Sequence, residues 1–224
     1  MKNYIIIVAG GTGSRMNNSV PKQFIPLHGK PILMHTIEKF HSSVPEINIA
    51  VVLANYLNEQ WKQLCVKHNF SIAHQLINGG ETRFHSVQNG LNNIPDNCIV
   101  GIHDAARPLV SKQTIINTFK TAEEKGNASP AISLNESIRV ITDDKNKAVD
   151  RNRYMIIQTP QCFQSAIIKK AFEQEYHVTF TDDAIVLEKT GEKINLVEGN
   201  RENIKITTSQ DLFIAEALMQ GGGY

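Results

Sequence analysis

Short apolar runs rich in β-branched residues alternate along this chain with longer segments in which apolar residues recur at helical spacing. Residues 5–8, 47–53 and 98–103 have the composition of buried strands, and residues 32–40 and 87–94 repeat an apolar residue every three or four positions. Strands that alternate with amphipathic helices are typical of a mostly parallel sheet covered by helices on both faces. We therefore predict a Rossmann-like, three-layer α/β/α fold.

Two later helices are indicated by hydroxyl side chains that stand where a helix would begin. Ser111 precedes one such segment, and Thr208 or Ser209 precedes the apolar residues within 212–218. A Ser or Thr side chain at this position accepts a hydrogen bond from the first helical turn. We therefore expect helices to begin close to these hydroxyls.

The segment from about residue 134 to residue 158 interrupts the alternation. Residues 139–141 and 154–157 have strand composition and flank a polar stretch at 143–147, which predicts a protruding β-hairpin arm. Because a lone hairpin is only marginally stable in water, we expect this arm to pack against a second copy of the chain in a homodimer. The sequence has no repeat or linker, so we treat residues 1–224 as a single domain.

The charge balance excludes a general attraction to nucleic acid or to an anionic membrane. Lys and Arg number 23 and Asp and Glu number 22, a net charge of +1, so any anion site must be local. Cys65, Cys98 and Cys162 lack the paired spacing of a zinc site, and the apolar run after Met1 is too short for a signal peptide or a membrane span. We expect reduced thiols and a cytoplasmic protein.

A glycine-rich loop follows the first predicted strand. It reads Ala9-Gly10-Gly11-Thr12-Gly13-Ser14-Arg15. Glycines let the backbone approach a ligand closely and point its N–H groups at phosphate oxygens. No Gly-Lys-Ser/Thr follows, as in a P-loop, and an irregular stretch reaching Pro21 replaces the helix of a dinucleotide fingerprint. The cations Arg15 and Lys22 in this region favour a phosphate site over a plain turn.

This loop, with its Arg-Met and Pro-Lys pairs, resembles that of nucleotidyltransferases. Six further motifs in order narrow the resemblance to the 2-C-methyl-D-erythritol 4-phosphate cytidylyltransferase family, over about residues 4–218. The motifs are Gly79-Gly80-Glu81-Thr82-Arg83 with Ser86-Val87, His103-Asp104-Ala105-Ala106-Arg107-Pro108, Val149-Asp150-Arg151, Gln158-Thr159-Pro160-Gln161, Thr181-Asp182-Asp183-Ala184 and Asn203-Ile204-Lys205-Ile206-Thr207. The resemblance implies transfer of the cytidylyl group of CTP to a polyol phosphate, with release of pyrophosphate, in non-mevalonate isoprenoid synthesis.

Repulsion between two phosphoesters sets the main demand on such a site. Two unit charges about 4 Å apart repel by roughly 1 kcal/mol in water and about 4 kcal/mol in a half-buried site, so cations must converge there. Five basic residues stand on predicted loops or strand ends: Arg15, Lys22, Arg107, Arg151 and Lys205. The resemblance implies that Arg15, Lys22 and Lys205 are catalytic, holding the triphosphate and the departing pyrophosphate. The attacking phosphate is already anionic and needs no general base.

The resemblance also implies a nucleotide site and an acceptor site. The nucleotide-binding residues would be Ala9, Gly10, Gly11, Gly13, Gly80, Glu81, Ser86 and Ala105. The acceptor-binding residues would be Asp104, Arg107, Ser137, Arg151, Thr159 and Thr181, with Arg151 reaching a neighbouring subunit from the arm. Mg²⁺ is expected to bridge the phosphate oxygens, and the sequence does not identify its protein ligands.

From the residues alone, several of these positions have a structural alternative. Asp104 and Arg107 could form an ion pair at a loop entrance, and Ser86 could be an exposed residue at the start of a helix. Thr181 with Asp182 fits a helix cap as well as a site. His103 is expected to be a packed strand residue rather than a ligand.

Of two departures from the family pattern, the first leaves the acceptor alcohol open. The first loop has Ala9-Gly10-Gly11 where the family more often has Ala-Ala-Gly, a variant also typical of ribitol-5-phosphate cytidylyltransferases, and Ser137 replaces a usual Thr. The Asp104-Ala105-Ala106-Arg107 and Val149-Asp150-Arg151 motifs favour the methylerythritol family. A hexose-1-phosphate nucleotidyltransferase and a non-catalytic nucleotide-sensing protein are further alternatives.

Overall fold

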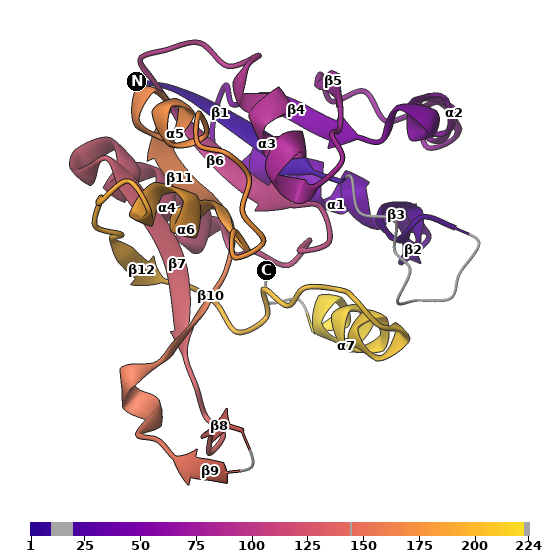
Figure 1. Cartoon of the computed structure of the whole chain (residues 1–224). Coiled ribbons are helices and arrows are strands. Elements are labelled where there is room, and N and C mark those ends of the chain that lie inside the picture. Colours follow the sequence, from indigo (N-terminus) through magenta and orange to yellow (C-terminus); the bar gives the residue numbers. More distant parts are fainter. Residues whose placement is uncertain (10–19, 144, 222–224) are drawn as a thin grey trace.

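One large sheet extends across the body of the molecule (Figure 1). The computed structural model describes residues 1–9, 20–143 and 145–221. Across the sheet the strands are β10 (Met155–Ile157), β7 (Asn127–Ser133), β11 (Gln161–Gln164), β6 (Cys98–Asp104), β1 (Lys2–Val8), β4 (Asn48–Leu53) and β5 (Gln75–Asn78), and β12 (Leu196–Glu198) pairs with β7. Strands β6, β1, β4 and β5 run parallel, whereas β11 is antiparallel to both its neighbours.

Helices cover both faces of this sheet, because strand residues point alternately to opposite sides. Ile5 and Ile7 of β1 pack with one helical layer, and Ile6 packs with the other. The first layer contains α1 (Ile32–Ser43), α2 (Asn58–Lys67), which follows the short helix η3 (Asn55–Leu57), and α4 (Lys112–Lys125). The second contains α3 (Arg83–Leu91), α5 (Ser165–Ala171) and α6 (Asp183–Glu188). The predicted three-layer α/β/α fold is confirmed.

The two predicted hydroxyl caps are also confirmed. The Ser111 side chain accepts the Thr114 N–H at 3.0 Å and begins α4. Thr208 begins α7 (Ser209–Gln220) in a reciprocal capping box with Asp211. Ala215 of α7 packs against Ile206 in a small core beside the two-residue strands β2 (Pro26–Leu27) and β3 (Lys30–Pro31). This core anchors the backbone next to Lys205.

The arm is present, but the predicted pairing within it was wrong. Residues between the ends of β7 and β10 leave the sheet and extend to the bottom of Figure 1. At the tip, β8 (Arg139–Thr142) pairs with β9 (Lys145–Ala148), whereas the apolar strand β10 pairs with β7 in the main sheet. Asp143 has a φ of 45°, a left-handed conformation that Asp tolerates better than most residues, so the chain reverses directly after β8.

Two further properties bear on the sequence-based expectations. Cys65, Cys98 and Cys162 form no disulfide. Within the described parts of the chain, none of the helices combines the length and the apolar character that crossing a bilayer would need.

Candidate active site

A cavity of about 290 Å³ opens at the carboxyl ends of β1 and β6, the edge where open α/β sheets bind ligands. Three segments complete its wall: the β5–α3 turn, the short helix η2 (Lys22–Phe24) and the segment before α7. The lining residues are Val8, Ala9, Lys22, Gln23, Gly80, Glu81, Thr82, Arg83, Ser86, Asp104, Ala105, Ala106 and Lys205. Residues far apart in the sequence therefore meet at one edge of the sheet.

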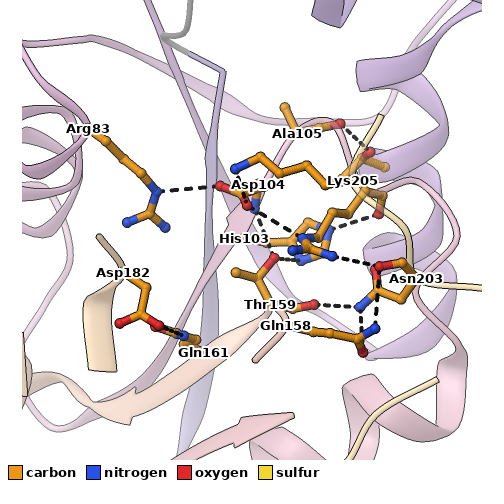
Figure 2. Close-up of polar contacts among 12 residues, drawn as sticks. Arg83, His103, Asp104, Ala105, Gln158, Thr159, Gln161, Asp182, Asn203 and Lys205 are labelled. Carbon is orange, nitrogen blue, oxygen red and sulfur yellow. Dashed lines mark hydrogen bonds and ion pairs between the residues drawn. The ribbon is translucent and has the colours of Figure 1, made fainter. Parts of the chain in front are cut away.

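Asp104 is the electrostatic centre of this cavity (Figure 2). Its carboxylate lies 2.8 Å from Lys205 Nζ, 3.4 Å from Arg83 Nε and 3.5 Å from Arg107 Nε, and only 8% of the residue is exposed. Burial alone would raise the pKa of Asp104, but the charges of Arg83, Lys205 and Arg107 outweigh it and hold the pKa well below its usual range. Asp104 is therefore a fixed anion at neutral pH, able to accept hydroxyl protons.

A buried hydrogen-bond chain through His103 and Thr159 fixes the backbone of Asp104. His103 Nε2 lies 3.0 Å from the Arg107 carbonyl oxygen, which can only accept, so Nε2 carries the proton. Nδ1 therefore accepts the Thr159 hydroxyl at 3.0 Å, and Thr159 Oγ1 accepts the Asp104 N–H at 3.2 Å. Burial lowers the pKa of His103 to about 3, so the imidazole is neutral, packed in its strand as the sequence predicted.

Buried amide side chains hold the segment that carries Lys205. Asn203, which is fully buried, donates from Nδ2 to the Thr159 carbonyl at 2.9 Å and toward Gln158 Oε1 at 3.4 Å. The Arg107 guanidinium donates from Nη1 to the Asn203 carbonyl at 2.7 Å. Figure 2 shows this cluster directly beneath Lys205. The ends of β6 and β10 thus determine where the lysine stands.

Arg83 connects Asp104 to a second buried carboxylate. Its Nη1 and Nη2 lie 2.8 and 2.6 Å from the two oxygens of Asp183, which is fully buried at the start of α6. The Gln161 side-chain oxygen in turn accepts the backbone N–H groups of Asp183 and Ala184 at 2.9 and 2.8 Å. Burial would lower the pKa of Arg83, but the charges of Asp183 and Asp104 raise it, so Arg83 remains a permanent cation.

The Gly80 turn packs tightly against the first turn of α3. Thr82 caps this helix by accepting the His85 N–H at 3.3 Å, and the Ser86 hydroxyl accepts the Gly80 N–H at 3.1 Å. Ser86 is buried, so the alternative of an exposed residue that starts the helix was wrong. A Cβ added to Gly80 would stand 2.5 Å from His85 Cβ, which explains the glycine.

Gln23 ties η2 to the end of β1. Its Nε2 donates to the Ala9 carbonyl at 2.8 Å, and the side chain is 1% exposed. The neighbouring Lys22 lines the cavity from the same short helix. This contact brings a basic side chain of the Pro-Lys motif to the end of the first strand.

Comparison with known proteins identifies the family of this chain. The model of the 2-C-methyl-D-erythritol 4-phosphate cytidylyltransferase family matches residues 4–221. A relative of that name from Phocaeicola vulgatus is 46% identical over 98% of this chain and 100% of its own length, and one from Bacteroides fragilis is 47% identical over 96% and 98%. The chain belongs to this family.

Solved structures of other family members have the same fold. The Francisella tularensis 2-C-methyl-D-erythritol 4-phosphate cytidylyltransferase superposes with a TM-score of 0.81 and 33% identity, over 97% of this chain and 99% of that one. The 4-diphosphocytidyl-2C-methyl-D-erythritol synthase of Anaerococcus prevotii superposes with a TM-score of 0.83 and 28% identity, over 98% and 96%. As a member of the cytidylyltransferase family, the chain is an enzyme.

The cavity brings together a large part of the cytidylyltransferase residues expected from the sequence. The expected residues that line it are Ala9, Lys22, Gly80, Glu81, Ser86, Asp104, Ala105 and Lys205. Arg107 and Thr159 stand behind Asp104 and are bonded into its supports. Gly10, Gly11, Gly13 and Arg15 lie outside the described residues.

Three of the expected acceptor residues lie neither in the cavity wall nor among the supports of Asp104. Ser137 and Arg151 are exposed on the arm, where Arg151 donates to the Asn135 carbonyl from the short helix η4 (Arg151–Arg153). Thr181 is exposed before α6, and Asp182 is the residue that caps this helix, accepting the Ile185 N–H at 2.9 Å. The helix-cap alternative therefore holds for Asp182.

Sequence reasoning assigned no role to the supporting residues Arg83, Asp183, Gln158, Asn203 and Gln23, although the first four stand within the family motifs. For Arg83 a signal was available. A cation in the first helical turn is unfavourable because the helix dipole is positive there, so an arginine beginning α3 indicates acidic partners from elsewhere. The buried amides carry no comparable signal, since their partners are backbone groups brought near only by the fold.

Proposed function

We propose that the cavity around Asp104 is where this chain transfers the cytidylyl group of CTP to 2-C-methyl-D-erythritol 4-phosphate, giving 4-diphosphocytidyl-2-C-methyl-D-erythritol and pyrophosphate. The reaction supplies non-mevalonate isoprenoid synthesis. The observation that carries the placement is the convergence of Lys22, Lys205 and Asp104 with the Gly80–Ser86 contact around one space. That space has cations for phosphates, a carboxylate for hydroxyls and backbone groups for a base.

In the proposed mechanism, a phosphate oxygen of the acceptor attacks the α-phosphorus of CTP. A new P–O bond forms as the bond from the α-phosphorus to the bridging oxygen breaks, and pyrophosphate leaves with the electron pair. Lys22 and Lys205, together with Arg15, stabilise charge on the five-coordinate phosphorus and the leaving group. Because the nucleophile is an anion, the side chains position and neutralise rather than remove a proton.

The acceptor polyol binds beside Asp104 in this proposal. The carboxylate accepts hydroxyl protons, and its low pKa keeps it in the accepting form. Arg107 supports it with an ion pair at 3.5 Å while tying the Lys205 segment to β6. The hydroxyl of Thr159 already bonds His103 and Asp104, so we assign it to positioning rather than to substrate contact.

The cytosine would occupy the end of the cavity formed by the β5–α3 turn. Backbone groups at Gly80 and Glu81 and the Ser86 hydroxyl offer a donor and acceptor set for its amino and carbonyl groups. Ala9 and Ala105, with Gly10, Gly11 and Gly13 of the first loop, would contact the ribose and phosphates.

Mg²⁺ would be held chiefly by the triphosphate. Among the described residues, no group of three or more His, Cys, Asp or Glu side chains stands close enough to bind an ion. Mg²⁺ retains waters and takes substrate phosphates as ligands, so in this proposal the triphosphate supplies most of its ligands. When bound, the ion would neutralise part of the phosphate charge, and the lysines of this chain would neutralise the remainder.

The arm is the proposed dimer contact. Through it, Ser137 and Arg151 would reach the acceptor phosphate that is bound in the cavity of the partner subunit. Its exposed apolar side chains support this. Val140, Ile141, Tyr154, Met155 and Ile156 are each between 42% and 77% exposed, which is costly for a monomer and typical of an interface. In the same proposal, Thr181 contacts the acceptor. The protein is proposed to be cytoplasmic.

An acceptor panel tests the proposal. The protein is incubated with CTP and Mg²⁺ and with methylerythritol 4-phosphate, ribitol 5-phosphate or a hexose 1-phosphate, and pyrophosphate release is followed. We expect turnover with the methylerythritol phosphate at a kcat/KM at least about a hundredfold above the others. Preference for ribitol 5-phosphate would overturn the acceptor assignment. CTP binding without pyrophosphate release from any acceptor would identify a nucleotide sensor instead.

A further inference from the structure

We infer that Arg83 is a positioning residue for this reaction: clamped by Asp183, it holds the Asp104 carboxylate in the orientation that receives the acceptor. The inference rests on the proposed function, because it assigns Asp104 to the acceptor. It adds to the site two residues, on α3 and α6, that the phosphate chemistry does not call for. Figure 2 shows Arg83 reaching Asp104 from the side opposite the amide cluster.

The clamp is built from two directed contacts and a third weaker one. Arg83 gives Nη1 and Nη2 to Asp183 at 2.8 and 2.6 Å and Nε to Asp104 Oδ1 at 3.4 Å. A guanidinium is planar, so the paired contact with Asp183 fixes the plane and therefore the direction of Nε. Asp104 Oδ2 faces Lys205 and Arg107 instead. The two carboxylate oxygens thus have different partners.

Asp183 is itself immobilised, which makes it a support rather than a surface counter-ion. It is fully buried at the start of α6, where Gln161 accepts its backbone N–H at 2.9 Å. Gln161, also fully buried, begins β11 next to β6. The carboxylate therefore has a fixed place relative to the sheet edge that carries Asp104.

Arg83 matters most once substrates arrive. Lys205 pairs with Asp104 in the protein alone, and it must also serve phosphate oxygens during the reaction. Arg83 has its other two nitrogens committed to Asp183, so it keeps facing Asp104 when Lys205 turns to a phosphate. Of the three cations whose charge lowers the pKa of Asp104, Arg83 has the largest charge effect, and Lys205 adds a hydrogen bond to its own.

Among the described residues, several charged or titratable groups face Asp104 from the neighbouring elements. They are Arg83 from α3, with Asp183 behind it, Arg107 after β6, Lys205 before α7 and the neutral His103 on the same strand. Lys22 lines the same cavity. Of the three cations paired with Asp104, Arg83 is the one that the described contacts also pair with a second buried carboxylate, so its removal tests the clamp specifically.

The test compares Arg83→Gln, Arg83→Lys and Asp183→Asn with a matched control, Lys169→Gln. Lys169 pairs with Asp96 at 2.7 Å and, like Arg83, has a side chain that is 28% exposed. Asp96 precedes the start of β6 and Asp104 ends it, so the control removes one charge at the far end of the same strand. Thermal melts verify that each variant is folded.

Two readouts separate positioning from simple destabilisation. The first is the titration of the Asp104 carboxyl carbon by ¹³C NMR in the protein without substrates, assigned with Asp104→Asn. The second is the KM for the methylerythritol phosphate against the KM for CTP, with the pH profile of kcat/KM. For Arg83→Gln we expect the Asp104 carboxyl to titrate at least about one pH unit higher than in the parent protein, where its pKa lies below the usual range of an aspartate.

In the same variant, the acceptor KM should rise about tenfold or more while the CTP KM changes by less than about threefold. The acid limb of kcat/KM should move to higher pH, and Arg83→Lys should recover part of both effects because it restores the charge without the planar fork. Asp183→Asn should shift the acceptor KM in the same direction as Arg83→Gln.

The outcomes distinguish this inference from the proposed function. If the parent protein releases pyrophosphate and Arg83→Gln behaves like Lys169→Gln, the inference is wrong and the function stands. Arg83 would be purely structural if Arg83→Gln lowered the melting temperature and raised both KM values by the same factor, while the Asp104 carboxyl titrated at the same pH as in the parent protein. If the parent protein has no turnover with the methylerythritol phosphate, the proposed function fails, and the NMR titration alone still decides whether Arg83 holds Asp104.

Discussion

His103 makes the stability of this protein depend on pH in a direction that can be worked out. Its pKa is lowered from 6.5 to about 3 by burial, so the folded state holds the imidazole neutral where the unfolded state binds a proton. The stability that depends on His103 being neutral is fully present above pH 6.5 and is lost as the pH falls from 6.5 toward 3. At 1.36 kcal/mol per unit, the 1.5 units between 6.5 and pH 5 cost about 2 kcal/mol of unfolding free energy.

Urea unfolding followed by circular dichroism, at about pH 7.5 and about pH 5, measures this loss in the parent and in His103→Gln. The variant will be less stable at both values, because it loses bonds to Arg107 and Thr159. The informative quantity is the difference between the two pH values, which should be about 2 kcal/mol smaller in the variant. The control is His41→Gln, which removes an exposed imidazole from α1 and should leave that difference as in the parent.

A pH dependence that is the same in His103→Gln and the parent would refute the reasoning. It would mean that the imidazole binds a proton in the folded state at about pH 5. The hydrogen-bond chain from the Arg107 carbonyl to the Asp104 N–H would then not have the assigned direction, because a doubly protonated ring cannot accept the Thr159 hydroxyl.

Three further predictions concern activity. Lys22→Ala and Lys205→Ala should each lower kcat by about a hundredfold or more with the fold intact by circular dichroism, because preorganised charge is lost chiefly in the transition state, and unchanged turnover in either would remove that lysine from the mechanism. Mixing Arg151→Ala subunits with Lys22→Ala subunits should restore about a quarter of parental activity if the arm completes the partner's site, since half of the dimers are then mixed and each mixed dimer has one intact site of two. An inactive mixture would mean that the arm serves only its own chain. Gly80→Ala should raise the KM for CTP at least about tenfold because the new Cβ meets His85 and displaces the turn, and an unaltered KM would show that this turn does not contact the nucleotide.

The positions of the cavity residues could be predicted because they depend on backbone periodicity. The apolar runs of β1, β4 and β6 identify parallel strands, and parallel strands place their carboxyl ends at one edge. Asp104 directly follows such a predicted strand, whereas Lys22 stands in the loop after the first strand and was placed in the site through its Pro-Lys pair. Lys205 follows no predicted strand, and only its family motif placed it with them.

The arm could not be predicted in detail, because no core constrains its register. Every residue of β8 and β9 is exposed, so neither strand has a buried apolar face that would select its partner strand and register. The apolar side chains of β10 were taken for the second strand of the hairpin, although they extend the main sheet beside β7. Asp143, with its left-handed backbone, stands where the chain passes from β8 toward β9.

The net charge of +1 and the demands of a triphosphate are reconciled by where the charges stand. Around Asp104 the cations Arg83, Arg107 and Lys205 face two carboxylates, Asp104 and Asp183, so this cluster carries one excess positive charge, while Lys22 and Glu81 of the cavity lining are opposite in sign. Each carboxylate lowers the cost of burying cations in the empty protein, yet the excess remains for an anion. Local attraction of this kind acts within about 10 Å at moderate salt, so the rest of the surface can stay balanced without weakening it.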